Sequence, residues 1–249
     1  MKFSVTIKNI AFNFAISLKE KFRNPILVSL MTFLPVYFLF LAALVMPDDT
    51  IFLEIIGEET YMGDVYLMSF TPVTASLVTS LFGLFIMIEA KDTDRRLLIA
   101  GSTRFQITTS RFWMILVVSI LVSAISIGMM LISFTPEDLI MFFLVTMLIS
   151  LIYGNIGMIA GTLLSKLSGV YAMMMLVSLD AGVFQNPIFM QEEPAWWMRI
   201  LPAYHPMELA NEIAFLGEIQ QTSSLIYTIV ILLILLLGAT AAFYLNSKR

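Results

Sequence analysis

The chain contains no cysteine, one histidine and few charged residues. The lack of cysteine excludes a disulfide framework and a thiolate metal site. With His205 as the single histidine, a histidine-based metal cluster is excluded and a histidine-activated nucleophile is poorly supported. No GxxxxGK[ST] motif occurs, so the chain has no P-loop of its own for a nucleotide. We therefore expect a chain that is not itself an enzyme and has no cofactor or metal.

Apolar residues dominate the composition. They make up 59% of the chain, charged residues make up 13%, and the mean hydropathy is +0.91. A soluble domain is about 45–50% apolar and about 25% charged. The apolar residues form continuous runs of about twenty, not the alternating strands of roughly ten that build outer-membrane barrels. This pattern predicts an all-α polytopic membrane protein.

Six apolar segments are each near the roughly 20 residues that a helix needs to cross a bilayer. Before them, apolar residues recur at steps of three or four from Phe3 to Phe22 among lysines, which predicts an amphipathic interfacial helix over residues 1–24. The fourth segment contains Gly157 and Gly161, a GxxxG spacing that permits close helix packing or arises by chance. We expect a single transmembrane domain over residues 1–249, with spans near 26–46, 65–88, 112–134, 139–164, 167–184 and 224–245.

The charged residues are segregated between the two sides of a six-span arrangement. Of the 14 Lys and Arg residues, only Arg199 falls on the opposite side from the rest. The acidic residues of the first and third connections fall on the side of Arg199: Asp48, Asp49, Glu54, Glu58, Glu59, Asp64, Glu137 and Asp138. Because basic loops face the cytoplasm, we expect both termini in the cytoplasm and the protein in the plasma membrane. Five or seven spans would scatter these charges.

The connection over residues 185–223 is too long and too patterned for a plain loop. Proline at a first turn predicts one short helix over Pro194–Ile200, and Pro206 and Gly217 predict the start and end of a second. Trp196 and Trp197 are typical of a membrane interface. We therefore predict an extracellular, re-entrant helical hairpin before the last span.

Asp180 is the one ionisable residue within a predicted span, four residues from its end. An intramembrane carboxylate is a candidate functional residue because its burial in lipid is costly. Three roles stay open. Asp180 reaches outer-side water or bonds the hairpin, lines a substrate path, or couples transport to protons.

Residues 89–111 form the densely charged interruption between the second and third spans. Asp92 or Thr93 can cap a short helix that ends at Gly101. Thr103 and Gln106 have capping-box spacing and predict a second helix that continues into the third span. Two helices around a glycine break, with exposed Arg, Leu and Phe, predict a compact knob for contact with another protein. The alternative is an elbow that anchors to anionic lipid.

These features, in this order, resemble the permease subunits of ABC-2 type exporters. In that family the second-to-third loop carries a pattern close to E-x-E-x-G-T-x-x-x-L-L-x-x-P-x-S-R, followed by a basic residue. This chain lacks the glycine before Thr93 and has Gly101-Ser102 where proline is usual. Two further segments, Leu179–Pro187 and Leu201–Pro206, are similar to family segments around the hairpin, with Ala181 in place of a serine. The positions in comparable order in the loop are Glu89, Lys91, Thr93, Leu97, Leu98, Arg104 and Arg111.

The resemblance implies two permease subunits, expected as a homodimer, with two copies of a separate ABC ATPase that binds ATP and Mg²⁺. Residues 89–111 would hold a cytoplasmic coupling helix, and ATP-driven closure would alternate access to a path between the subunits. The expected coupling residues are Glu89, Lys91, Asp92, Thr93, Arg95, Arg96, Leu97, Leu98 and Arg104, and the candidates for the substrate path or hairpin are Asp180, Asn186 and Tyr204.

The expected partners thus include the ATPase and the lipid bilayer. We expect no nucleic-acid partner. The alternative functions are a secondary transporter or channel that needs no ATPase, a membrane-embedded enzyme, and a non-transporting assembly or regulatory subunit. The transported substrate is not readable from these residues.

Overall fold

The computed structural model describes residues 2–45, 49–53, 57–189 and 194–246, without the side chains of residues 2–5, 91, 92 and 246. Several residues used above therefore lie outside the described residues. They are Asp48, Glu54, Lys248 and Arg249, and, for their side chains, Lys2, Phe3, Lys91 and Asp92.

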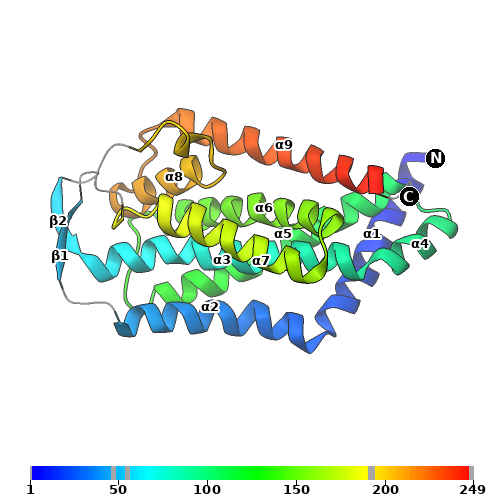
Figure 1. The fold of residues 1–249 in the computed structure, drawn as a ribbon, viewed down its shortest axis with the longest axis horizontal. Coiled ribbons are helices and arrows are strands. Elements are labelled where there is room, and N and C mark those ends of the chain that lie inside the picture. The colour runs from blue at the N-terminus through cyan, green and yellow to red at the C-terminus, as the bar shows by residue number, and fades with distance from the viewer. Residues whose placement is uncertain (1, 46–48, 54–56, 190–193, 247–249) are drawn as a thin grey trace.

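Six long apolar helices run side by side in one bundle (Figure 1). Their bounds agree with the six predicted spans to within a few residues, except that the third helix begins eight residues earlier. The helices are α2 (Pro25–Val45), α3 (Met62–Glu89), α5 (Arg104–Met130), α6 (Leu139–Leu163), α7 (Lys166–Leu179), which the π-helical turn η1 (Asp180–Phe184) extends, and α9 (Thr222–Asn246). The prediction of an all-α polytopic membrane protein is confirmed.

The shorter elements lie at the two ends of the bundle (Figure 1). The helix α1 (Lys2–Phe22), which was predicted to be interfacial, the helix α4 (Lys91–Ile99) and the end of α9 lie at one end, which we call the basic end. The helix α8 (Tyr204–Leu216) and a hairpin of β1 (Thr50–Leu53) and β2 (Glu58–Tyr61) lie at the other, the acidic end.

Two predictions for the acidic end need correction. The segment over Pro194–Ile200 forms only a 3₁₀ turn, η2 (Met198–Ile200), because Leu201 is extended, as residues before a proline usually are. The antiparallel pairing of β1 with β2 was not predicted at all. The second predicted helix is present as α8, which begins at Tyr204, two residues before Pro206, and ends at Leu216, with Gly217 as its left-handed C-cap at φ +71°.

Helix α3 is the centre of the bundle, and its closest neighbour is α6. In its most apolar stretch, 89% of α3 is buried, against 11% of α9. A side chain on Gly157 would place its Cβ 2.0 Å from the carbonyl oxygen of Ser80 on α3. On Gly161 it would meet the carbonyl oxygen of Leu84 at 2.5 Å. The GxxxG spacing therefore serves close packing of α6 on α3 and is not a chance spacing.

Helix α9 is bonded to its neighbours at its two ends. Just before its first turn, Glu212 of α8 accepts hydrogen bonds from the backbone N–H groups of Gln220 and Gln221, at 3.0 and 3.3 Å. Near its last turn, the guanidinium of Arg104 lies 4.8 Å from the centre of the Tyr244 ring. This cation–π contact joins the end of α9 to the start of α5.

Candidate functional site

The connection between α3 and α5 folds as a helix, a glycine break and a second helix start. The predicted N-cap of α4, Asp92 or Thr93, was wrong. The N-cap is Ala90, without a side-chain cap, because α3 ends at Glu89 and the chain turns directly into α4. Gly101 ends the helix at φ +93°, where its N–H bonds the carbonyl of Leu98. This left-handed conformation costs glycine little.

The capping box at the start of α5 is confirmed. The hydroxyl of Thr103 accepts from the backbone N–H of Gln106, and the Gln106 side chain accepts from the N–H of Thr103. Helix α5 thus begins at Arg104 and runs without interruption into the apolar span. Only four residues, Ala100 to Thr103, separate α4 from α5.

Helix α4 has one exposed basic face and one face against the core. Arg95 and Arg96 are exposed, and so is Ile99, at 81%. Since residues three and four apart share a helix face, these three residues form one surface, which we call the α4 ridge. Leu97 and Leu98, expected to be exposed, are half-buried against the core that α3 and α5 form.

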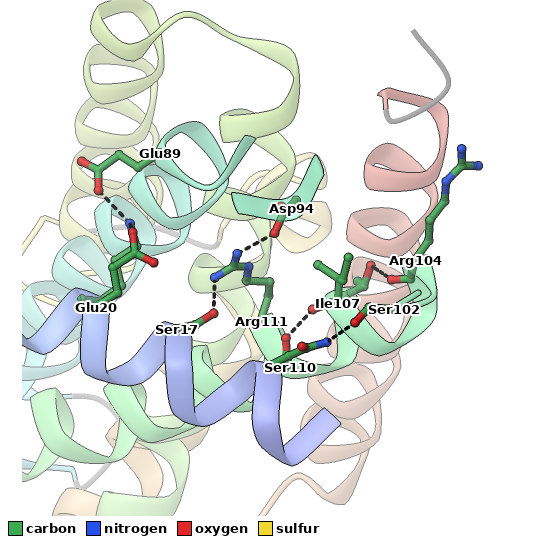
Figure 2. A network of polar contacts seen from close by, with 12 residues as sticks. Ser17, Glu20, Glu89, Asp94, Ser102, Arg104, Ile107, Ser110 and Arg111 are labelled. Atoms are coloured by element: carbon green, nitrogen blue, oxygen red, sulfur yellow. Dashed lines mark hydrogen bonds and ion pairs between the residues drawn. The ribbon is translucent and has the colours of Figure 1, made fainter. Parts of the chain in front are cut away.

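Behind the ridge, Arg111 of α5 is buried with 1% of its surface exposed (Figure 2). Its Nη2 donates to Oδ1 of Asp94 on α4 at 2.6 Å, and its Nη1 donates to the Ser17 hydroxyl on α1 at 2.9 Å. One guanidinium therefore bonds two helices besides its own. We call Arg111, Asp94 and Ser17 the clasp.

The electrostatics of the clasp depend on its burial. Burial raises the pKa of Asp94, whereas the charges of Arg111 and Lys21 act in the opposite direction. A buried ion pair contributes little net stability, but removal of one partner is costly because the other charge remains buried. The clasp is therefore expected to tolerate loss of both charges better than loss of one.

Two further polar contacts join α1 to the same end of the bundle. Lys21, with 3% of its side chain exposed, pairs with Glu89 of α3 at 2.9 Å. The amide of Asn13 donates to the hydroxyl of Ser102 at 3.3 Å. Glu89 was predicted to meet an ATPase, and here it binds α1. Arg104, predicted for the same role, lies over Tyr244.

The buried face of α1 was not predicted from the sequence. Asn13, Ser17 and Lys21 recur at steps of four and are almost fully buried. On the predicted apolar face, Ile7 and Phe22 are 52% and 40% exposed. The four-residue spacing of these polar side chains was the available signal. Thr93 is half-buried, and its predicted part in coupling stays a prediction.

At the acidic end, Asp180 is buried and bonded within the chain. Its Oδ2 accepts from the Tyr153 hydroxyl of α6 and, at 3.2 Å, from the backbone N–H of Ala203 before α8. Of the three roles left open, bonding of the hairpin matches these contacts. Asn186 is buried and accepts from the N–H of Ile188, and Tyr204 is half-buried. A substrate path at these residues stays a prediction.

His205 links α8 to α9 at the acidic end. Its ring stacks on Tyr227 at 4.6 Å, and its Nδ1 lies 3.3 Å from the Ser224 hydroxyl, which donates to Glu208 at 2.6 Å. Burial lowers the pKa of His205, Glu208 opposes this shift, and Arg199 adds to it.

The lowered pKa of His205 predicts that acid destabilises the protein. The unfolded chain binds a proton near pH 6.5, before the folded chain does. The contribution of neutral His205 to the free energy of unfolding is therefore complete above about pH 6.5. It decreases as the pH falls toward the lower pKa that His205 has in the folded state. The melting temperature should fall between about pH 7 and pH 5.5. The His205→Gln variant should lose this part of the pH dependence, and an unchanged slope in that variant would contradict the assignment.

One known protein family matches most of this sequence. The sequence model of a family described as ABC-2 family transporter protein matches residues 56–245, well over half of the chain. The match begins before α3 and ends in the last turns of α9, so it includes α4, the two helices it connects and the hairpin. A comparison with curated proteins gave no match. With this match and, among the described residues, six helices long and apolar enough to cross a membrane, the chain belongs to the ABC-2 family of transporter proteins.

Proposed function

We propose that the chain is the permease subunit of an ATP-driven exporter and that α4 docks a separate ABC ATPase. The α4 ridge carries this proposal. Two arginines and an exposed isoleucine lie on a short helix at the basic end, and the clasp supports that helix from behind. A merely solvated loop would not need a buried clasp that joins it to two other helices, α1 and α5.

The partner would supply the chemistry that this chain lacks. ATP and Mg²⁺ would bind to the ATPase, since this sequence has no P-loop. Closure of two ATPases would displace α4 and, through the short turn to α5, the membrane-crossing helices. Supporting the cytoplasmic position of α4, the basic residues of α1, α4 and α5 share one end of the bundle.

A second copy of the chain would complete the transporter. In their most apolar stretches only 28% of α2 and 11% of α9 are buried within one copy. Lipid and a second permease subunit are the two neighbours that suit such apolar faces. We propose a homodimer in the plasma membrane, with export through a path between its subunits and with both termini in the cytoplasm.

Reversing the charges of the α4 ridge should abolish ATPase docking. The Arg95→Glu/Arg96→Glu variant, co-expressed with a candidate ABC ATPase from the same genome that co-purifies with the wild type, should retain little co-purifying ATPase. Lost pairing of two charges at an interface costs about 2–5 kcal/mol, which corresponds to a loss of roughly thirty-fold or more in affinity.

The matched control is Arg199→Glu, which reverses an exposed arginine at the acidic end. It should co-purify with the ATPase as the wild type does. Equal recovery of ATPase with the ridge variant would contradict docking on α4. Substrate uptake into vesicles without ATP would instead favour a secondary transporter.

A further inference from the structure

Helix α1 is bonded to residues 89–111, which we call the coupling region. The helix itself lies outside residues 56–245, which match the family. A helix that only rests in the membrane interface buries its apolar residues and leaves its polar face in water. In α1 the residues with the least exposure are instead polar: Asn13 and Ser17 at 1% and Lys21 at 3%. The contact of α1 with the bundle therefore depends on specific hydrogen bonds.

These bonds reach three different parts of the coupling region (Figure 2). Asn13 bonds Ser102 in the turn before α5, Ser17 bonds Arg111 within α5, and Lys21 pairs with Glu89 at the end of α3. From residue 13 to residue 21 the contacts extend over about 12 Å of helix. Attachments spread over this length oppose both rotation and sliding of α1.

Arg111 is the one residue in the clasp that bonds both α1 and α4. A guanidinium is planar and holds its donors in a fixed fork. With Nη1 on Ser17 and Nη2 on Asp94, this one side chain of α5 bonds both α1 and α4. Because Arg111 is buried, water does not readily replace either partner.

We propose that Arg111 is a positioning residue that joins α1, α4 and the first turns of α5 into one rigid unit, so that α1 moves with α4. The part of this proposal that concerns motion rests on the docking of an ATPase on α4. The rigidity of the unit can be measured in the permease alone.

The first experiment measures rigidity without an ATPase. Since the chain has no cysteine, Ala15→Cys on α1 and Ala100→Cys after α4, both exposed, can carry spin labels in the full chain in phospholipid nanodiscs. We expect one narrow distance distribution between the labels. Arg111→Met should broaden it, and Lys19→Met, which removes an exposed charge from α1, should not.

Milder variants cover the case in which Arg111→Met does not fold. Ser17→Ala removes one bond and leaves the buried ion pair, so it should broaden the distribution to a smaller extent. Arg111→Lys keeps the positive charge but lacks the planar fork of donors. The width of its distance distribution should lie between those of the wild type and Arg111→Met. If Arg111→Met folds and its distance distribution is as narrow as that of the wild type, the proposal is overturned. If Arg111→Met does not fold, the same result in Ser17→Ala overturns it.

The second experiment tests motion in the complex with the co-expressed ATPase. Asn13→Cys and Ser102→Cys, joined by a short thiol cross-linker, fix α1 to the turn after α4. We expect permease-dependent ATP hydrolysis to stay within about twofold of the reduced sample, whereas Arg111→Met lowers it roughly tenfold, a typical size for lost coupling. The ATPase should still co-purify with Arg111→Met.

The outcomes separate the two proposals. Loss of ATP hydrolysis on cross-linking would show that α1 and α4 move apart, and full ATP hydrolysis in Arg111→Met would show that the clasp is not needed; either overturns the inference. If wild-type permease never binds the ATPase, the proposed function fails, and the spin-label distances still decide whether the unit is rigid.

Discussion

The Gly157→Leu variant should be recovered only as unfolded or aggregated protein. Even a Cβ at this position would lie 2.0 Å from the Ser80 carbonyl oxygen and 2.8 Å from its carbon. Both are backbone atoms of the central helix α3, so no side chain can move aside. Overpacking costs about 1–3 kcal/mol where neighbours can adjust, and more where they cannot. Size-exclusion chromatography and melting in detergent would measure the loss.

Gly128 on α5 supplies the matched control. A Cβ there meets no atom within 4 Å. Gly128→Leu should therefore elute and melt as the wild type does, or slightly higher, because leucine favours a helix over glycine by roughly 0.5–1 kcal/mol. If Gly157→Leu also behaved like the wild type, α6 could not be packed against α3 as described.

The Asp180→Leu variant should detach the hairpin at the acidic end from the bundle. It would leave the Tyr153 hydroxyl and the Ala203 N–H, both on fully buried residues, without their acceptor. Each unpaired buried donor costs about 1–3 kcal/mol. We expect a lower melting temperature and faster reaction of an Ala203→Cys thiol with a maleimide, since the chain has no other cysteine.

Asp180→Asn is the control because its side-chain oxygen can still accept both bonds. It should melt much closer to the wild type than Asp180→Leu does. Equal melting and equal labelling of all three proteins would contradict a role in attaching the hairpin. A stable Asp180→Leu protein with altered ATP hydrolysis in the complex would instead support the substrate path.

Features with a local cause were predictable from the sequence. Hydrophobic runs located the six spans, and the capping box at Thr103 and the glycine break at Gly101 depend on residues within one turn. The cap of α4 failed because its start is set by the end of α3, which places Ala90 in a helical conformation. The residues around Asp92 and Thr93 alone therefore do not determine where α4 begins.

The clasp was not predictable because its partners are distant in sequence. Arg111 is 17 residues from Asp94 and 94 from Ser17. Before folding, nothing distinguishes Arg111 from Arg104 as the arginine that becomes buried. The β-hairpin was missed for another reason: strands of four residues produce too short an alternation to stand out beside spans of about twenty residues.

The attachments of α9 imply an uneven tolerance of sequence change along this helix. Glu212 and Arg104 hold its two ends, while between them few side chains are buried in one copy, Thr228, Ala239 and Phe243 among them. Exchange among Leu, Ile and Val at the exposed middle positions, Ile229, Val230, Leu233, Ile234 and Leu237, alters only the apolar surface that α9 presents outside one copy of the chain. The exposed positions in the middle of α9 therefore have room for sequence drift, whereas the side chains that make the end contacts, Glu212, Arg104 and Tyr244, have little.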